Sequence, residues 1–283
     1  MRRPPRLALP CHLLLTLVAG LAGISSTAQA QNYGSGDWGD GRNYAFQRVG
    51  YYGIRNNIWG DYQRGAGWQY TWASWGNNWL VWGAESNHRN GAGYVKGYPQ
   101  IVRGWSIDDG FDLSRNHGLG IKVPKINEAK VRWNFQSPNS GRHISLIDVY
   151  LHWWHTPGRS EEAALNIQLV PHVQEKNANG WLLDDSKRYG YRIGERTIGG
   201  IRYEAWVAWD HPDARAGERL MHVRPLTFTK NAEHNLLGII RWGRDHGIVD
   251  NNMYLTSIQA GWEIIEGGSG FKTTRYRTRV NGR

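Results

Sequence analysis

Two segments of the sequence, residues 147–154 and 162–169, alternate aliphatic side chains with polar and aromatic ones. Successive side chains of a β-strand point to opposite faces, so the aliphatic side chains are expected in a core and the others on a second face. Aromatic rings stack on the C–H faces of sugars, and planar amides and carboxylates bond to pairs of hydroxyl groups. We therefore predict that the second face binds carbohydrate. Its candidate binding residues are Asp148, Tyr150, His152, Asn166 and Gln168.

The rest of the sequence indicates a scaffold of β-strands, because alternating apolar residues are bounded by Gly, Pro, Asn and Asp. Residues 231–247 differ, since their apolar residues have helical spacing, with Thr229 or Asn231 as a cap and Gly247 as a terminator. No repeat or proline-rich linker divides residues 31–283, so we expect one all-β domain with a single late helix. The predicted strands cover residues 144–154, 164–173, 202–208, 254–263 and 271–280.

Tryptophan is abundant, with 16 residues in the chain. Some of these rings are expected on the carbohydrate face. Others are expected to be ordinary core residues, among them Trp133, Trp153 and Trp206.

Residues 1–30 have the features of a cleaved secretory signal peptide. Three arginines precede an apolar run over residues 7–24, and the small residues at 28 and 30 fit a signal-peptidase site. The only cysteine, Cys11, lies in this segment, so a cysteine nucleophile, disulfide or metal ligand is excluded from residues 31–283. We expect a secreted protein, extracellular or periplasmic, with no membrane attachment after cleavage.

The chain is basic, but its positive charge is scattered. Loss of the signal arginines lowers the formal net charge from +10 to +7. The remaining arginines run from Arg42 to Arg283 without a basic block, so we expect no nucleic-acid partner. Arginines at 275, 277 and 279 alternate with Tyr276 and Thr278, which predicts a solvated edge strand.

Motifs for metal and nucleotide chemistry are absent from the sequence. It contains no His-Glu-x-x-His pair, and no glycine-rich phosphate-binding motif follows a predicted strand. We therefore expect no metal and no other cofactor. We expect the partner to be a polysaccharide and the protein to be a monomer.

Six segments carry a resemblance to a known family. They are residues 56–60 (Asn-Asn-Ile-Trp-Gly), 95–99 (Val-Lys-Gly-Tyr-Pro), 147–151, 165–169, 236–242 and 254–263. The last contains Ile-Gln-x-Gly-x-Glu and precedes the glycines at 267 and 268. In this order the segments resemble glycoside hydrolase family 12, the secreted jelly-roll endoglucanases and xyloglucanases. The resemblance implies a β-jelly-roll sandwich of two antiparallel sheets with an aromatic cleft and one helix, which cleaves internal β-1,4 bonds of a glucan such as cellulose or xyloglucan.

The resemblance also implies roles for individual residues. Glu263 would be the general acid/base, and Asp148 would be the acid that hydrogen-bonds the nucleophile. Glu266 is a rival for the acid position, but it is expected in the turn beyond the strand. The residues implied to bind sugars or to shape the cleft wall are Asn57, Trp59, Tyr98 and Pro99.

The sequence departs from the family at the nucleophile. The family motif is Glu-x-Met-Ile-Trp-Leu, and the register over residues 164–169 places Ala164 where its glutamate belongs. Glu162 lies two residues earlier, on the same strand face. Three hypotheses follow: a bulge brings Glu162 into the nucleophile's place, Asp148 or Glu162 activates a water in an inverting mechanism, or the protein binds glycan without cleaving it.

A different enzyme class is also open. His152 beside Asp148 could abstract a proton next to a uronic carboxylate, with an arginine neutralising that carboxylate. This chemistry would make the protein a lyase-like enzyme acting on an acidic polysaccharide.

Overall fold

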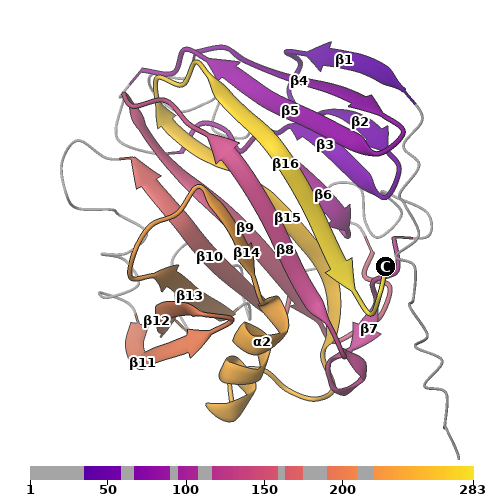
Figure 1. The fold of residues 1–283 in the computed structure, drawn as a ribbon, viewed down its shortest axis with the longest axis vertical. Coiled ribbons are helices and arrows are strands. Elements are labelled where there is room, and N and C mark those ends of the chain that lie inside the picture. Colours follow the sequence, from indigo (N-terminus) through magenta and orange to yellow (C-terminus); the bar gives the residue numbers. More distant parts are fainter. Residues whose placement is uncertain are drawn as a thin grey trace, which may run out of the picture.

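A computed structural model of the protein describes residues 35–58, 67–89, 95–107, 117–158, 163–174, 190–208 and 219–283. Within these residues the chain forms two β-sheets and one α-helix (Figure 1). The predicted signal peptide, Trp59 and Glu162 lie outside the described residues.

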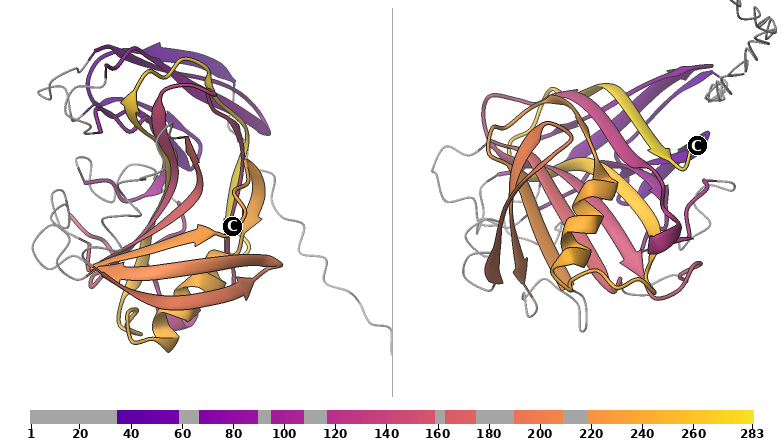
Figure 2. Two further views of the ribbon diagram at one scale, coloured as in Figure 1. Left: turned by 90° about the vertical axis from the view of Figure 1, so that its left-hand side faces the viewer. Right: turned by 60° about the horizontal axis from the view of Figure 1, so that its bottom comes forward.

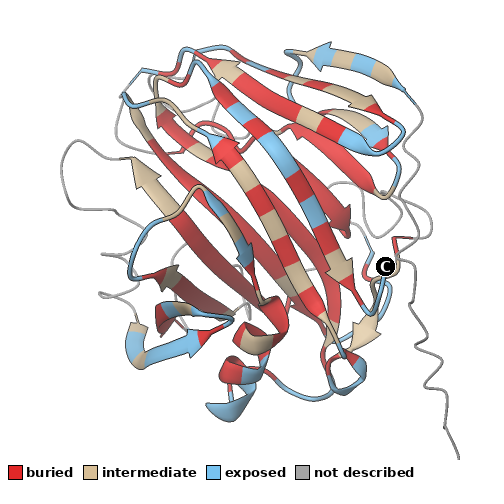
Figure 3. Ribbon diagram, viewed as in Figure 1, coloured by how far each residue is buried: buried red, intermediate tan, exposed pale blue. Residues whose placement is uncertain are grey.

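The smaller sheet has six strands in the spatial order β1-β4-β5-β16-β8-β14. Strand β16 lies between β5 and β8, but its described pairs with β5 are limited to Phe271, Lys272 and Thr273. Among the described strands the arginines at 275, 277 and 279 pair with β8 alone, as predicted for an edge. The prediction of a solvated face holds, since Arg275 and Arg277 are exposed while Tyr276 and Thr278 are buried (Figure 3). The strands are β1 (Gly36–Asp40), β4 (Gln69–Gly76), β5 (Trp79–Ser86), β8 (Ala129–Gln136), β14 (Asn231–His234) and β16 (Phe271–Val280).

The larger sheet has ten strands, in the order β11-β12-β13-β10-β9-β15-β6-β3-β2, with β7 paired to β15. All of its described pairs are antiparallel except β10 with β13, which is parallel. They are β2 (Ala45–Val49), β3 (Tyr52–Asn56), β6 (Gln100–Gly104), β7 (Ile121–Lys122), β9 (Arg142–His152), β10 (Leu165–Gln174), β11 (Gly190–Ile198), β12 (Ile201–Ala208), β13 (Arg219–Pro225) and β15 (Tyr254–Glu266). A 3₁₀ turn, Val123–Lys125, follows β7.

The two sheets stack face to face as a β-jelly-roll sandwich, which confirms the predicted fold class. The larger sheet is bent, with β2 and β3 at one end and β11 to β13 at the other turned toward the same side (Figure 2). We call its face toward the other sheet the core face and its opposite face the inner face. In a β-sandwich, apolar side chains alternate with polar ones along each strand, and the apolar ones fill the space between the sheets. The sequence shows this alternation.

Tryptophans join the two sheets across the core. The ring of Trp262 on β15 lies 4.8 Å from that of Trp82 on β5 and 5.3 Å from that of Trp133 on β8. All three are buried, as is Trp206. Trp153 is instead 45% exposed, because β9 ends at His152 and the alternation that placed Trp153 in the core ends with it.

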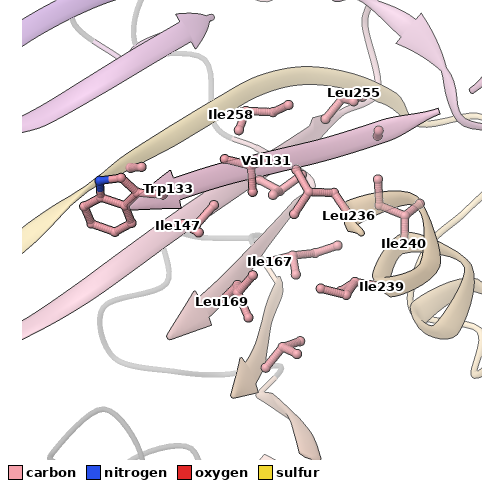
Figure 4. Packing of buried hydrophobic residues seen from close by; sticks show 14 of the residues in the cluster. Val131, Trp133, Ile147, Ile167, Leu169, Leu236, Ile239, Ile240, Leu255 and Ile258 are labelled. Atoms are coloured by element: carbon pink, nitrogen blue, oxygen red, sulfur yellow. The ribbon is translucent and has the colours of Figure 1, made fainter. Parts of the chain in front are cut away.

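The helix α2 (Leu236–Asp245) closes one end of the sandwich. Its residues Leu236, Ile239 and Ile240 pack against the core beside Val131 and Ile167 (Figure 4). Asn235, rather than Thr229 or Asn231, caps the helix, and its Oδ1 accepts a hydrogen bond from the Gly238 amide at 3.1 Å.

The predicted helix begins too early because residues 231–234 pair with β8 as strand β14. At its other end, Gly247 has a φ of +72° just past the last turn, as expected for a terminator. In the part of the chain that the structure describes, no helix has the length and apolarity that a membrane span requires.

Burial of His143 makes the fold sensitive to acid. This side chain is inaccessible to solvent and packs against Phe271, with ring centroids 4.8 Å apart. Burial, followed by the nearby charges of His172 and Lys230, lowers the pKa of His143 to about 3. The unfolded chain binds a proton at this histidine near pH 6.5, so the folded state loses stability as the pH falls from there toward 3.

We predict that His143→Phe loses less unfolding free energy than wild type between pH 7 and pH 4. Chemical denaturation at several pH values measures this difference, which is worth about 1.4 kcal/mol for each pKa unit removed. His246→Phe, at an exposed position after α2, serves as the control. Parallel pH profiles for wild type and His143→Phe would contradict the prediction.

Candidate functional site

Strand register places one row of polar side chains across the inner face. Asp148 on β9 pairs with Gln259 on β15 and with Gln168 on β10, which in turn pairs with His222 on β13. We call these four residues the polar row. The predicted alternation is confirmed here, since Ile147 and Val149 on either side of Asp148 belong to the core. The row is therefore on the face that the sequence assigned to carbohydrate.

Asp148 is a buried carboxyl group whose pKa is strongly raised. It is 2% exposed, and Asn166 donates from Nδ2 to its Oδ1 at 3.1 Å. The side chains of Tyr98 and Gln168 also hydrogen-bond to it. Burial raises the pKa of Asp148 to about 6, although these three hydrogen bonds lower it. The carboxyl group thus changes charge close to neutral pH, where a general acid or base is most effective.

Tyr98 connects Asp148 with Glu263. The segment around Tyr98 runs alongside β15, where the amides of Ile264 and Trp262 donate to the carbonyls of Gly97 and Pro99 at 2.9 and 3.2 Å. Tyr98 therefore stands beside Glu263 while its hydroxyl reaches the Leu146 carbonyl at 3.4 Å.

The charges of both carboxylates also affect the pKa of Tyr98. Burial raises the pKa of Tyr98 well above its usual value, and the negative charges of Asp148 and Glu263 raise it further. The phenol consequently stays protonated, and it can act as a hydrogen-bond donor between the two carboxyl groups.

Glu263 lies on the same face as Asp148 but not in the same row. It pairs with Ile144 on β9 and is partly exposed, whereas Gln259 is the residue opposite Asp148. Four residues along β15 correspond to roughly 13 Å. The side chains of Asp148 and Glu263 must lean toward each other over Leu146 to act on one substrate bond.

A second cluster on the inner face surrounds Trp105. Its ring centroid lies 5.4 Å from that of Tyr150 and 4.5 Å from that of His152. The Trp105 carbonyl accepts hydrogen bonds from Ser257 Oγ at 2.7 Å and from Gln259 Nε2 at 3.1 Å. Sequence reasoning missed Trp105, Ser257 and Gln259 as site residues.

The sequence pattern marks some of these three residues as site residues but not others. Trp105 follows β6 outside any alternating run, so nothing in the pattern marks it. Ser257 and Gln259 could have been found, because alternation along β15 puts them on the face of Glu263.

His152 is enclosed rather than presented to a polymer. It has no exposed surface, its Nδ1 lies 2.7 Å from Thr256 Oγ1, and Trp105 covers its ring. A base that removes a proton from a polysaccharide must touch the substrate. This environment favours a structural role for His152 over the lyase hypothesis.

The register corrects the expected position of Ala164. The Ala164 amide donates to the Leu151 carbonyl at 2.9 Å, which places Ala164 level with His152. Glu263 is level with Ile144, eight residues away along β9, or roughly 26 Å. Ala164 therefore does not face Glu263, and the β10 residues bonded to Asp148 are Asn166 and Gln168. The irregularity in this strand pair falls between Leu169 and His172, and none lies between Leu165 and Leu169.

Some of the remaining predicted residues lie at the site, and others support the segments that form it. Asn57 is half-buried, and its carbonyl accepts the Tyr98 amide at 2.7 Å. Pro99 is buried beside β15, and Tyr150 is half-buried next to Trp105. Glu266 is the last residue of β15, paired with Arg142, and so belongs to the strand rather than to the turn where it was expected. Among the described residues, no group of three or more His, Cys, Asp or Glu side chains is placed to hold a metal ion.

Solved structures match this architecture closely. The endoglucanase Cel12A of Rhodothermus marinus superposes with a TM-score of 0.70 at 19% identity, over 86% of this chain and 99% of that one. A family 12 xyloglucanase of Bacillus licheniformis gives 0.70 at 17% identity, over 86% and 100%. Endoglucanase 3 of Trichoderma harzianum, from the same family, gives 0.67 at 16% identity, over 87% and 98%. The protein has the glycoside hydrolase family 12 fold.

The similarity to glycoside hydrolase family 12 lies in the structure far more than in the sequence. No protein-family model matches the sequence, and no curated protein matches it either. Nearly the full length of each family 12 structure is covered, so the jelly roll with its helix is reproduced as a whole. Activity and substrate are a separate question that depends on the inner face.

The hydrogen bond from Tyr98 should hold down the pKa of Asp148. Tyr98→Phe removes this donor and leaves the burial unchanged, so the pKa of Asp148 is expected to rise above about 6. A carboxyl-carbon NMR titration measures it directly. Tyr150→Phe is the matched control, because Tyr150 is not among the groups that lower the pKa of Asp148. An unchanged pKa in Tyr98→Phe would show that the phenol does not bond to the carboxylate.

Proposed function

We propose that this protein is a secreted glycoside hydrolase that cleaves internal β-1,4 bonds of a glucan such as cellulose or xyloglucan. The family 12 fold supports a polysaccharide-active protein. The observation that carries the proposal is the arrangement of Asp148, Tyr98 and Glu263, in which one buried phenol is acted on by two carboxylates of the inner face. Secretion rests on the signal-like residues 1–30.

The spacing of the two carboxyl groups favours an inverting mechanism. Retaining hydrolysis requires carboxyl groups about 5–5.5 Å apart, and inverting hydrolysis requires about 6.5–9.5 Å. One strand spacing and four residues place the Cα atoms of Asp148 and Glu263 roughly 14 Å apart. Side chains that lean toward each other over Leu146 reduce the carboxyl separation toward the inverting range.

In this mechanism one carboxyl group is the general base and the other is the general acid. Asp148, as carboxylate, accepts a proton from a water molecule that attacks the anomeric carbon. Glu263, as carboxylic acid, gives its proton to the glycosidic oxygen while the bond from that oxygen to the anomeric carbon breaks. The sugar leaves with inverted configuration at this carbon, and both side chains exchange their proton with solvent before the next cycle.

A second candidate function is glycan binding without cleavage. Asn166 and Gln168 bond to Asp148 with amide groups, and an amide can neither attack a sugar nor remove a proton from water. The three hydrogen bonds also lower the pKa that burial alone would give Asp148, and so weaken it as a base. These contacts favour a protein that retains the family's sugar-binding face without its turnover.

Glu263→Gln distinguishes the two functions. For a hydrolase, loss of the general acid should lower kcat by about 10²–10⁴-fold, with oligosaccharide binding retained because the amide keeps the shape of the side chain. Reducing-end release from soluble β-glucan and xyloglucan measures the rate. Glu266→Gln, three residues further along β15, is the control. An undiminished rate in Glu263→Gln would remove this residue from the mechanism.

The anomer formed first tests the inverting assignment. Wild type is expected to release α-configured product from a β-glucan, as seen by NMR at early times, and Asp148→Asn is expected to be inactive. Ala164→Glu is expected to change neither rate nor anomer, because position 164 is far from Glu263. A retaining wild type, or a gain of retaining activity in Ala164→Glu, would contradict the mechanism.

A further inference from the structure

Aromatic side chains line the outer face of the six-stranded sheet, on the opposite side of the sandwich from the polar row. Trp68, just before β4, is 53% exposed, and Tyr70 on β4 is 41% exposed. Trp72 follows at the same two-residue interval and is half-buried. The residues between them face the core, and Thr71 is fully buried. Alternation therefore sends the rings of Tyr70 and Trp72 outward. The Asn87 amide donates to the Trp68 carbonyl at 2.9 Å, which extends the pairing of β4 with β5 to Trp68.

The neighbouring strand extends this surface. Trp79 on β5 is 51% exposed and pairs with Gly76 at the end of β4. We call Trp68, Tyr70, Trp72 and Trp79 the aromatic platform; β4 and β5 lie next to each other in Figure 1. On β5, Trp82 points the other way and meets Trp262 of the ten-stranded sheet, so the core separates the platform from the candidate site.

Glycines keep the rings low on the sheet. The ring of Trp72 lies over Gly83, where an added Cβ would come within 2.1 Å of the Phe271 carbonyl oxygen and within 2.8 Å of Trp72 Cζ2. In the same way Tyr70 covers Gly39 and Trp79 covers Gly76, and a Cβ at either glycine would collide with the ring. Each of these rings thus occupies space that any other residue on the paired strand would fill. The result is a broad, low aromatic surface rather than a set of projecting side chains.

The chemistry of the platform fits a sugar polymer. Its large side chains are aromatic, and the faces of aromatic rings stack on the C–H faces of pyranose rings. Exposed apolar surface of this kind on a monomer marks a binding site. Rings spread along β4 and β5 can stack on several sugar units of an ordered polysaccharide at once.

We propose that the aromatic platform is a second, non-catalytic binding site for the surface of an insoluble β-1,4-glucan. It would hold the protein on the polymer through sugar–aromatic stacking while the inner face stays accessible. The identity of the polymer rests on the proposed function, whereas the platform itself rests on the four rings and the glycines beneath three of them.

Retention on microcrystalline cellulose tests the proposal. The double variant Trp68→Ala/Trp79→Ala is expected to bind about tenfold more weakly than wild type, because it removes two of the four rings that stack on sugars. Tyr191→Ala and Phe228→Ala, which remove rings that are 48% and 42% exposed elsewhere, are matched controls and should bind like wild type. Melting temperatures verify that each variant is folded.

The outcomes separate this inference from the proposed function. The double variant should hydrolyse soluble β-glucan at the wild-type rate, while Glu263→Gln should retain full binding to cellulose. Wild type that binds cellulose through the platform but cleaves no glucan would overturn the proposed function alone. Equal binding by wild type and the double variant would overturn the platform, as would a wild type that binds neither cellulose nor insoluble xyloglucan. A shift from dimer to monomer in the double variant, with cellulose binding unchanged, would overturn it in favour of self-association.

Discussion

The cost of burying the Asp148 carboxyl group is the constraint that organises the inner face. A charged carboxylate that leaves water needs hydrogen-bond donors, and here Tyr98, Asn166 and Gln168 supply them. These donors come from two separate segments, so their convergence depends on the pairing of β9 with β10 and on the segment around Tyr98 that runs along β15. These hydrogen bonds offset only part of the effect of burial, so the pKa of Asp148 remains raised to about 6. A fold that only needed stability would gain from an apolar residue at this position.

Alternation made most of the fold predictable from the sequence. The strand at Phe271–Val280 was predicted with its observed bounds, and β15 begins at Tyr254 as expected. Alternation also assigned Asp148, Asn166 and Gln168 to the correct face, because a period of two fixes the face of every residue in a strand. It failed where the strand ended, as at Trp153, or where pairing with another strand replaced a helical turn, as in residues 231–234.

The register between neighbouring strands could not be predicted in the same way. A shift of two residues between neighbouring strands preserves every face, so alternation alone cannot say which of Ala164, Asn166 and Gln168 lies opposite Asp148. Hydrogen-bond pairing decides this, and it depends on the whole sheet rather than on one segment. The Trp105 cluster was missed for a related reason, since a residue outside any strand has no period to reveal which face it covers.

We propose that sugars bind on the inner face over Tyr98, with the bond to be cleaved between Asp148 and Glu263. A crystal structure of Glu263→Gln with a bound cello-oligosaccharide tests it most directly. The account predicts a glycosidic oxygen within about 3 Å of the amide at position 263 and a water molecule between Asp148 and the anomeric carbon. An oligosaccharide bound away from Tyr98, or one whose glycosidic bond cannot reach both side chains, would contradict it.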